Sequence, residues 1–557
     1  MPAMRKVSIT LACILLMTAA SAQRRPNILF IAVDDLKPEI GAYGSRIAHT
    51  PNIDRLAAAG TVFLANYCQQ ALCGPTRASL MTGLRPDHTE IWNMRVRMRD
   101  VNPDILTLPQ YLARNGYVTS GIAKVFDPRC VDADFDKPSW TIPYLGTDTR
   151  YLAPGLRYPV AGKYQSAESH RRADSITRDA AARGRSRAET AKLIEDHVKP
   201  TTEAEDLPDS AYLDGIHVRQ VRDRLAGLAA NGKPFFMAVG LVRPHLPFVA
   251  PKRYWDLYDR DRLTLAAFRG QPSGVPAIAM HNASEIRSYT DMPGVIAATP
   301  QQPHGLTLPD DKQRQLLHGY YAATSYTDAN IGVLLDALDA LGIRDNTIVV
   351  LWGDHGWHLG DHNLWCKHDN FEQATRAPLI ISAPGVKPSR TQSLTEFVDV
   401  FPTLCELAGL PVPTHLQGNS LAGLMRNPRR RVKDYAVSQY PRTSDRAATR
   451  QRPYEQGDVM GYSIRTQRYR YTLWLRGAYR SARPLATATV EGVELYDYRR
   501  DPGETVNAAS DRSYAKARAR LHGHLVDYFG RHAGRDLTPP AAAHQGLPHR
   551  TDQGPGK

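Results

Sequence analysis

Two continuous apolar runs constrain the fold of this chain, because each one stops abruptly at charged residues. Asn27–Val33 reads NILFIAV and ends at Asp34-Asp35. Thr347–Trp352 reads TIVVLW and ends at Gly353-Asp354-His355. Apolar runs without polar alternation are typical of strands that are buried on both faces of a parallel sheet. The sequence therefore predicts such strands, each of which delivers polar groups from its carboxyl end.

Two further strands and a helix extend this pattern. Phe235–Gly240 leads into Arg243-Pro244-His245, and Tyr117–Ala123 leads into Lys124. Asp328–Leu341 starts with an aspartate and carries its leucines on one stripe, as an amphipathic helix does. Strands that alternate with helices predict an α/β fold, with a mainly parallel sheet covered by helices on both faces. Ligands of such sheets bind beyond the carboxyl ends of the strands, so these polar groups can share one pocket.

The chain length of 557 residues predicts one large or two unequal domains. We expect a large domain over residues 23–429 and a smaller α+β subdomain over 430–530. In the latter, Gly461–Leu475 and Val493–Tyr498 alternate like half-exposed antiparallel strands. Tyr144–Asp206 has no clear strand pattern and is interpreted as an insertion that decorates the surface. The segment 531–557 is rich in Pro, Gly, Ala and His, which predicts a disordered tail.

Residues 1–22 have the three parts of a secretory signal peptide. Arg5 and Lys6 are basic, Val7–Thr18 is apolar, and Ala20-Ser21-Ala22 is a small-residue cleavage site. The alternative is an anchor retained on the same segment. No other apolar run is long enough to span a membrane. We therefore expect an exported protein, periplasmic or secreted, with no membrane contact after signal cleavage.

The formal net charge of +14 indicates the kind of partner. Removal of the signal peptide lowers it by two, to +12, and leaves the protein basic. A basic exported protein favours acidic polysaccharides over nucleic acid. The arginine-rich clusters at 183–187 and 429–433 are interpreted as solvated faces rather than binding sites.

Three aspartates indicate a metal site. Asp34, Asp35 and Asp354 are hard oxygen ligands, and three converging carboxylates repel one another unless a divalent cation lies among them. Calcium fits such a set best, with magnesium second. An aspartate pair after a strand is also common as a loop cap, but the conjunction with Asp354 favours the metal. Because calcium prefers oxygen, His355 either binds the metal or orients its neighbours.

The number of cysteines in the mature chain is odd, so at least one thiol has no partner within the chain. The chain has six cysteines, and five remain after signal cleavage, an odd number without zinc-site spacing or a dense disulfide framework. Their pairing cannot be derived from the sequence. They are Cys68, Cys73, Cys130, Cys366 and Cys405.

Cys73 lies in the segment ALCGPTRASLMTGLRP, which combines a reactive atom with features that suit an anion. Pro75 suits the first turn of a helix that continues through Arg77 to Thr82. A helix N-terminus favours anions, and the guanidinium fork of Arg77 matches tetrahedral oxyanions. We interpret this segment as a reactive site.

The segment Cys73-Gly74-Pro75-Thr76-Arg77, with Thr82-Gly83 downstream, resembles the C-x-P-x-R motif of type I sulfatases. PNILFIAVDDL, TPNIDRLAAAG, GDHGWHLGDH, FPTLCELAGL and DPGETVN are also similar to sulfatase sequences. Blocks such as RPHLPF, SQYPR and MGYSIRT resemble the iduronate 2-sulfatase-like branch. The resemblance covers almost the whole mature chain and implies an alkaline-phosphatase-like fold, with residues 23–429 as the catalytic domain.

The resemblance also implies a mechanism. A separate formylglycine-generating or sulfatase-maturating enzyme would oxidise Cys73 to formylglycine, whose hydrate is the nucleophile. Calcium would be held by Asp34, Asp35, Cys73, Asp354 and His355. Arg77 and Lys124 would steady the nucleophile and the sulfate. His245 and Lys367 would contact sulfate oxygens or protonate the leaving group.

The implied substrate is a 2-O-sulfated uronic acid or a similar sugar of a sulfated polysaccharide or oligosaccharide. In this branch a basic group of the C-terminal subdomain holds the sugar carboxylate, and Arg450 or Arg452 could supply it. Two alternatives remain open. A phosphomonoester or phosphonate hydrolase shares the fold, and a non-catalytic relative would only bind sulfated glycans.

One position departs from the family pattern. Relatives read G-K-V-F-H-P where this chain reads Ala123–Pro128, with Asp127 in place of the histidine. The family histidine contacts the formylglycine hydroxyl and helps to expel sulfate. Asp127 could act as a general base, but its charge would repel the sulfate ester unless Lys124, Arg77 or the metal offsets it.

Overall fold

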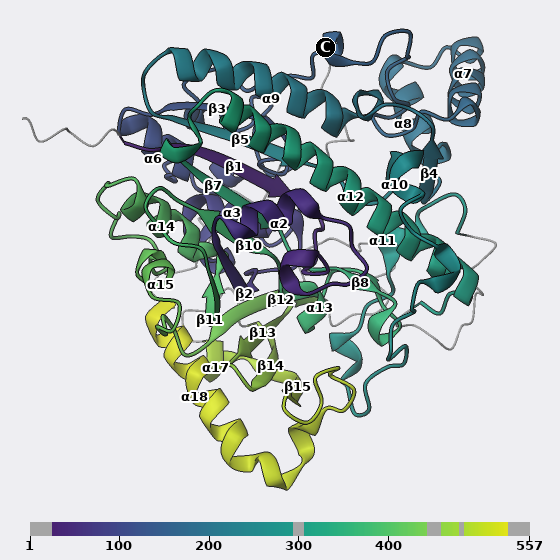
Figure 1. Cartoon of the computed structure of the whole chain (residues 1–557). Helices are drawn as coiled ribbons and strands as arrows, with labels where there is room; N and C mark the ends of the chain where they lie inside the picture. Colours follow the sequence, from purple (N-terminus) through teal and green to yellow (C-terminus); the bar gives the residue numbers. More distant parts are fainter. Residues whose placement is uncertain (1–24, 293–305, 443–457, 478–483, 533–557) are drawn as a thin grey trace, which may run out of the picture.

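A seven-stranded sheet forms the centre of the protein, for which a computed structural model describes residues 25–292, 306–442, 458–477 and 484–532 (Figure 1). The strand order is β11-β2-β10-β7-β1-β5-β3. The bounds are β1 Asn27–Val33, β2 Thr61–Tyr67, β3 Val118–Ala123, β5 Phe235–Leu241, β7 Thr347–Gly353, β10 Leu379–Ser382 and β11 Ser389–Glu396. Only β10 runs antiparallel to its neighbours β2 and β7. The mainly parallel sheet predicted from the apolar runs is confirmed.

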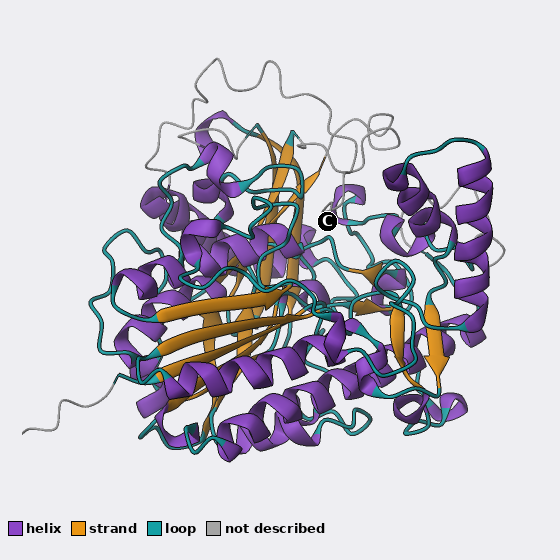
Figure 2. Ribbon diagram, turned by 90° about the horizontal axis from the view of Figure 1, so that it is seen from above, coloured by secondary structure: helices purple, strands orange, loops and turns teal. Residues whose placement is uncertain are grey.

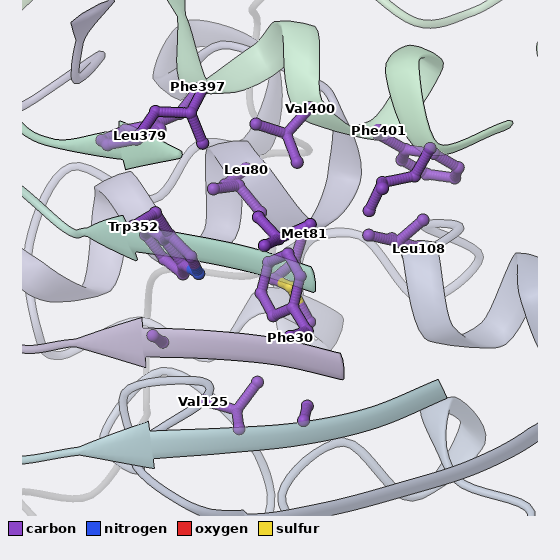
Figure 3. Close-up of a cluster of buried hydrophobic side chains, with 14 of the residues drawn as sticks. Phe30, Leu80, Met81, Leu108, Val125, Trp352, Leu379, Phe397, Val400 and Phe401 are labelled. Carbon is purple, nitrogen blue, oxygen red and sulfur yellow. The ribbon is translucent and has the colours of Figure 1, made fainter. Parts of the chain in front are cut away.

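Helices cover both faces of this sheet (Figure 2). On β1, Leu29, Ile31 and Val33 pack in one core cluster with side chains of α2 (Pro51–Ala58), α9 (Leu213–Ala230) and α12 (Asp310–Ala340). The alternate residues, Phe30 among them, belong to a second cluster with side chains of α3 (Cys73–Thr82), α6 (Leu108–Arg114) and α14 (Val400–Leu407). Figure 3 shows Phe30 below Met81 of α3 in this second cluster. A strand buried on both faces has no polar alternation, which explains the run NILFIAV.

The register of the central strands brings the predicted polar groups together. Val33 pairs with Leu241 on β5 and with Gly353 on β7. The residues that follow, Asp34 and Asp354, therefore leave the sheet side by side. At the same edge a Cβ atom on Gly240 would lie 2.0 Å from the carbonyl carbon of Lys124, so this close approach of β5 to the end of β3 requires glycine.

The insertion Tyr144–Asp206 contains more structure than its sequence predicts. It forms α7 (Ala167–Ala182), α8 (Arg187–His197) and β4 (Thr202–Glu205), and the two helices lie at the periphery of the molecule (Figure 1). β4 pairs in parallel with β6 (Phe248–Pro251), although the sequence of this segment has no clear strand pattern. The predicted helix Asp328–Leu341 is the second half of the longer α12.

The C-terminal region forms a four-stranded antiparallel sheet with one long helix. Its elements are β12 Ala436–Arg442, β13 Val459–Arg465, β14 Tyr469–Arg476, β15 Thr489–Asp497 and α18 Ala515–His532. The expected half-exposed strands are instead buried on both faces along most of β13 and β14. Leu521 and Phe529 of α18 pack on one face, while Trp474 on the other packs with Ala279. The division at residue 430 stays a prediction.

Short elements complete the described chain. They are α4 Pro86–Thr89, α5 Met98–Val101, α10 Lys252–Trp255, α11 Ser284–Arg287, α13 Glu372–Thr375, α15 Ala422–Arg426, α17 Pro484–Thr487, β8 His358–Leu359 and β9 Trp365–Cys366. Among the described residues, no helix combines the length and apolar character needed to cross a bilayer. The predicted signal peptide lies outside the described residues, as does nearly all of the predicted tail.

Candidate functional site

Three buried carboxylates meet at the carboxyl ends of β1 and β7. Asp34, Asp35 and Asp354 are fully buried, and one oxygen from each lies within 4.8 Å of the others. The backbone N–H of Asp35 donates to Asp354 Oδ1 at 2.9 Å, which links the two strand ends. Three carboxylates in so small a volume repel one another unless cations balance them. An all-oxygen set of this kind fits a hard divalent cation.

His355 directs one ring nitrogen at these carboxylates. Its Nδ1 lies 2.9 Å from the carbonyl oxygen of Gly356, a contact that requires the proton on Nδ1. In the neutral ring Nε2 carries the lone pair, and it faces Asp35 Oδ1 at 3.4 Å and Cys73 Sγ at 3.4 Å. A backbone contact that fixes the tautomer in this way is typical of a metal-binding histidine.

Arg77 bridges two of the carboxylates. Its Nη2 donates to Asp34 Oδ1 and its Nε to Asp354 Oδ2, each at 3.0 Å. The remaining nitrogen, Nη1, donates to the backbone carbonyls of Lys124 and Val125. The side chain is fully buried, and its guanidinium lies over the Trp352 ring. The structure therefore places Arg77 against the carboxylates rather than toward the open side of the site.

Cys73 is the first residue of α3, and its side chain lies beside His355. The helix starts two residues before Pro75, which occupies the first turn as predicted. Burial, with Asp34 next in size, raises the pKa of the Cys73 thiol well above its usual range. The thiol is therefore protonated at neutral pH and is a poor nucleophile. All five described cysteines are unpaired, so Cys73 is not the odd one left by disulfide formation.

Lys124 reaches the same cluster from the end of β3. Its Nζ lies 2.5 Å from Asp34 Oδ2 and 3.7 Å from Asp127 Oδ2. Burial acts to raise the pKa of Asp34, but Lys124, His245 and Arg77 together hold it well below its usual range. Asp35 differs because burial outweighs its attraction to Lys367 and raises its pKa to about 7.

His245 and Lys367 meet a carboxylate that the sequence did not predict. Glu285 on the short helix α11 lies 3.2 Å from His245 Nε2 and 3.0 Å from Lys367 Nζ. Lys367 also contacts Asp35 at 3.0 Å and lies over the Trp357 ring. The Nδ1 atom of His245 lies 2.5 Å from the Leu246 carbonyl oxygen, so Nε2 is the nitrogen directed at the site. Glu285 therefore links the two groups expected to meet the substrate.

Asp127 also has an unexpected partner. Its carboxylate is bound by Arg129 through Nε at 2.9 Å and Nη2 at 2.9 Å. The Asp127 side chain is fully buried, whereas the Arg129 side chain is 54% exposed. The charge of Asp127 is therefore offset mainly by Arg129, a residue that the sequence analysis did not single out.

The partly exposed side chains define the open side of the site. Lys124, Glu285 and His245 are 14%, 18% and 20% exposed, while the three aspartates are fully buried. Arg450 and Arg452, the predicted carboxylate-binding candidates, lie outside the described residues. Glu285 had no local signal because only tertiary packing brings α11 here, whereas the Asp-x-Arg spacing could have identified Arg129.

Comparisons with known proteins show the family of the chain. The sequence profile of the family described as Sulfatase matches residues 26–410, and a second profile, N-sulphoglucosamine sulphohydrolase, C-terminal, matches residues 360–529. The chain is 33% identical to mouse iduronate 2-sulfatase over 90% of this chain and 94% of that protein. It is 26% identical to a Δ4,5-hexuronate-2-O-sulfatase of Bacteroides thetaiotaomicron, over 92% and 90% of the two chains.

Solved structures share the fold. A 2-O GAG sulfatase aligns with a TM-score of 0.60 at 22% identity, over 92% of this chain and 93% of that one. A phosphonate monoester hydrolase from Silicibacter pomeroyi aligns with a TM-score of 0.65 at 22% identity, over 92% and 97%. The fold therefore does not separate sulfate from phosphonate chemistry. Because a sulfatase profile matches more than half of the chain and a relative is 33% identical over most of it, the protein belongs to the sulfatase family of sulfuric ester hydrolases.

Proposed function

We propose that the protein is an exported sulfatase that hydrolyses sulfate esters of a sugar, through a formylglycine derived from Cys73. One observation carries this proposal. Cys73 lies where His355 and the aspartates meet, with the cations of Lys124 and Lys367 acting on the same atom. A single side chain is thereby surrounded by a candidate metal site and by groups that suit a tetrahedral anion.

The metal would be held by Asp34, Asp35, Asp354 and His355, with residue 73 completing the set. Calcium is the proposed ion because the ligand atoms are mainly carboxylate oxygens. When bound, it would polarise the sulfate and neutralise developing negative charge. Arg77 would fix Asp34 and Asp354 in place, since its guanidinium contacts both carboxylates.

Residue 73 would supply the nucleophile. A buried thiol with a raised pKa is a poor nucleophile, which supports its replacement by the hydrated aldehyde. One hydroxyl of the hydrate gives its proton to an aspartate carboxylate of the site as its oxygen attacks sulfur, while the bond from sulfur to the sugar oxygen breaks. The second hydroxyl then loses its proton as sulfate leaves, the aldehyde reforms, and water regenerates the hydrate.

His245, protonated on both ring nitrogens, is the proposed proton donor to the departing sugar oxygen. Burial lowers the pKa of this histidine, while its hydrogen bond with Glu285 acts to raise it. Its Nε2 faces the site on the partly exposed side, and Nδ1 is held by a backbone carbonyl. Lys124 and Lys367 would contact the sulfate oxygens that carry negative charge. Glu285 would keep His245 and Lys367 at a fixed separation through its two carboxylate oxygens.

The proposed substrate is a 2-O-sulfated uronic acid or a similar residue of a sulfated polysaccharide or oligosaccharide. Relatives named iduronate 2-sulfatase and Δ4,5-hexuronate-2-O-sulfatase, aligned along most of this chain, support this choice. The net charge of +14 suits an acidic glycan. Export, to the periplasm or outside the cell, is proposed from residues 1–22. Maturation would require a separate formylglycine-generating or sulfatase-maturating enzyme.

Mass spectrometry and kinetics together test this function. The peptide containing residue 73 should carry the aldehyde mass, and kcat/KM for 2-O-sulfated uronate disaccharides should exceed that for matched phosphate and phosphonate esters. The Cys73→Ala protein should fold and release no sulfate. A larger kcat/KM for phosphonate esters would favour the phosphonate hydrolase of the same fold. An unmodified thiol with glycan binding but no turnover would favour the non-catalytic relative.

A further inference from the structure

The pair Asp127–Arg129 is built into the wall of the proposed sulfate site. Asp127 Oδ1 accepts hydrogen bonds from the backbone N–H of Arg129 at 3.0 Å and from its Nε at 2.9 Å. Asp127 Oδ2 accepts from Nη2 at 2.9 Å. The contact is bidentate, which holds the guanidinium in one plane relative to the carboxylate. A fully buried carboxylate thus holds an arginine that is half exposed.

These contacts leave Asp127 poorly suited to act as a general base. Three hydrogen bonds from one residue occupy its oxygens, and Lys124 Nζ lies 3.7 Å from Oδ2. Burial acts to raise the pKa of Asp127, but the hydrogen bonds and charge of Arg129 lower it below its usual range. A carboxylate of low basicity accepts protons weakly. Its clear structural effect is to orient Arg129.

Arg129 lies close to the reactive residue. Its neighbour Cys130 packs against the start of α3, since a Cβ atom on Gly74 would lie 2.4 Å from Cys130 Sγ. Within the described residues, the hydrogen bonds of Arg129 use its backbone N–H, Nε and Nη2, and Nη1 makes none.

A second pair in the chain provides a comparison. Asp148 and Arg150 have the same spacing, and Arg150 also donates its backbone N–H, Nε and Nη2 to the carboxylate. That carboxylate is 24% exposed, and its arginine is 86% exposed. The Asp-x-Arg contact is therefore a local motif that can form on the surface. What distinguishes Asp127–Arg129 is the full burial of the carboxylate and its position between Lys124 and the start of α3.

We propose that Arg129 is a specificity-determining residue that binds a non-bridging oxygen of the tetrahedral anion through Nη1, with Asp127 as its positioning residue. This inference rests on the proposed sulfatase function. Arg129 would add a third cation to Lys124 and Lys367 around the anion, on the partly exposed side of the pocket. The negative charge introduced by Asp127 would then be matched before the sulfate ester enters.

The test compares Arg129→Gln with Arg150→Gln, the matched control from the surface pair. With a sulfated disaccharide, Arg129→Gln should raise KM about ten- to a hundredfold, as expected for one lost charge-assisted hydrogen bond. Inorganic sulfate should inhibit Arg129→Gln more weakly than the wild type, by a similar factor. In Arg150→Gln, both KM and the inhibition by sulfate should be unchanged. Unchanged KM and sulfate inhibition in Arg129→Gln would overturn the proposal.

A double-mutant cycle separates the two residues. If Asp127 acts only through Arg129, then Asp127→Asn raises KM in the wild type and has no further effect in Arg129→Gln. An equal loss of kcat in both backgrounds would instead identify Asp127 as an independent base and overturn its positioning role. The double variant also removes the buried unpaired carboxylate that Arg129→Gln leaves, so it is the variant to use if the single variant fails to fold.

Calorimetry with inorganic sulfate keeps this inference distinguishable from the proposed function. If the wild type carries formylglycine but turns over no sulfate ester, the proposed function fails. Weaker sulfate binding by Arg129→Gln than by Arg150→Gln would still support the anion contact. Equal binding by both variants, or no sulfate binding by the wild type, would overturn it.

Discussion

Asp34 and Asp354, separated by more than three hundred positions in the chain, are held together by one guanidinium, since Arg77 lies 3.0 Å from an oxygen of each. A lysine would have to serve both carboxylates from a single nitrogen atom, and it would lose the contacts of the Arg77 guanidinium with the backbone carbonyls of Lys124 and Val125. We therefore predict that Arg77→Lys lowers kcat/KM at least a hundredfold and destabilises the fold by about 3–5 kcal/mol, as breaking a buried pair does. Urea denaturation and steady-state kinetics measure the two effects.

An exposed ion pair serves as the control for Arg77. Arg55 contacts Asp336 at 2.7 Å with both side chains about half exposed or more. Pairs of this kind contribute at most about 1 kcal/mol, so Arg55→Lys should leave the urea midpoint and kcat/KM nearly unchanged. Wild-type activity in Arg77→Lys would contradict the proposed bridging role.

Glu285 offers a second prediction, because its carboxylate contacts both His245 and Lys367. Glu285→Gln keeps the volume but removes the charge that holds these cations in place. We expect kcat to fall about ten- to a hundredfold, the usual range for a misplaced acid or cation. Glu285→Asp should recover part of the loss. A KM effect alone, with kcat unchanged, would instead indicate that Glu285 contacts the sugar.

The central sheet and the cluster of carboxylates at its edge could be predicted because their signal is local. A strand buried on both faces reads as a continuous apolar run, and the residues that end it, such as Asp34 and Asp354, must lie at one edge of a parallel sheet. Glu285 could not be predicted in the same way, because a four-residue helix from a distant loop carries it into the site.

The burial of both faces of the C-terminal strands also could not be predicted from their own sequence pattern. The alternation in Gly461–Leu475 correctly indicated antiparallel strands, but both faces are covered, by α18 and by residues such as Ala279. Which surface covers a sheet depends on tertiary packing rather than on the strand's own residues. Asp127 differs, because its partner Arg129 is only two residues away and the Asp-x-Arg spacing could have identified the pair.

Metal binding should stabilise the protein, because a cation relieves repulsion among three buried carboxylates. At a hundred times its Kd, calcium is expected to add about 2.7 kcal/mol to the free energy of unfolding. Chelation should lower the melting temperature and abolish turnover, and magnesium should restore less than calcium. A melting temperature that does not respond to calcium or to chelation would contradict the proposed site.

The Asp35→Asn variant tests whether Asp35 is one of the metal ligands. Burial raises the pKa of Asp35 to about 7, so its ionised form is costly in the metal-free protein. Without metal at pH 8, the asparagine variant should therefore be at least as stable as the wild type. It should lose the increase in the free energy of unfolding that calcium gives the wild type. A variant that keeps the full gain would exclude Asp35 as a ligand. Differential scanning calorimetry with calcium and with chelator measures both quantities.

His217, which lies outside the proposed catalytic site, allows a prediction of how the free energy of unfolding depends on pH. It lies buried on α9, its Nε2 is 2.9 Å from Thr147 Oγ1, and burial lowers its pKa from 6.5 to about 4. Between these pH values the unfolded chain binds a proton that the folded protein does not. The stability associated with neutral His217 is thus fully present above pH 6.5 and is lost as the pH falls toward 4, by about 3 kcal/mol.

In His217→Gln, which can still hydrogen-bond Thr147, urea midpoints measured from pH 7 to pH 4.5 should fall less steeply than in the wild type. The exposed His522→Gln serves as the control and should retain the wild-type slope, whereas identical slopes in wild type and His217→Gln would show that this histidine protonates freely in the folded state.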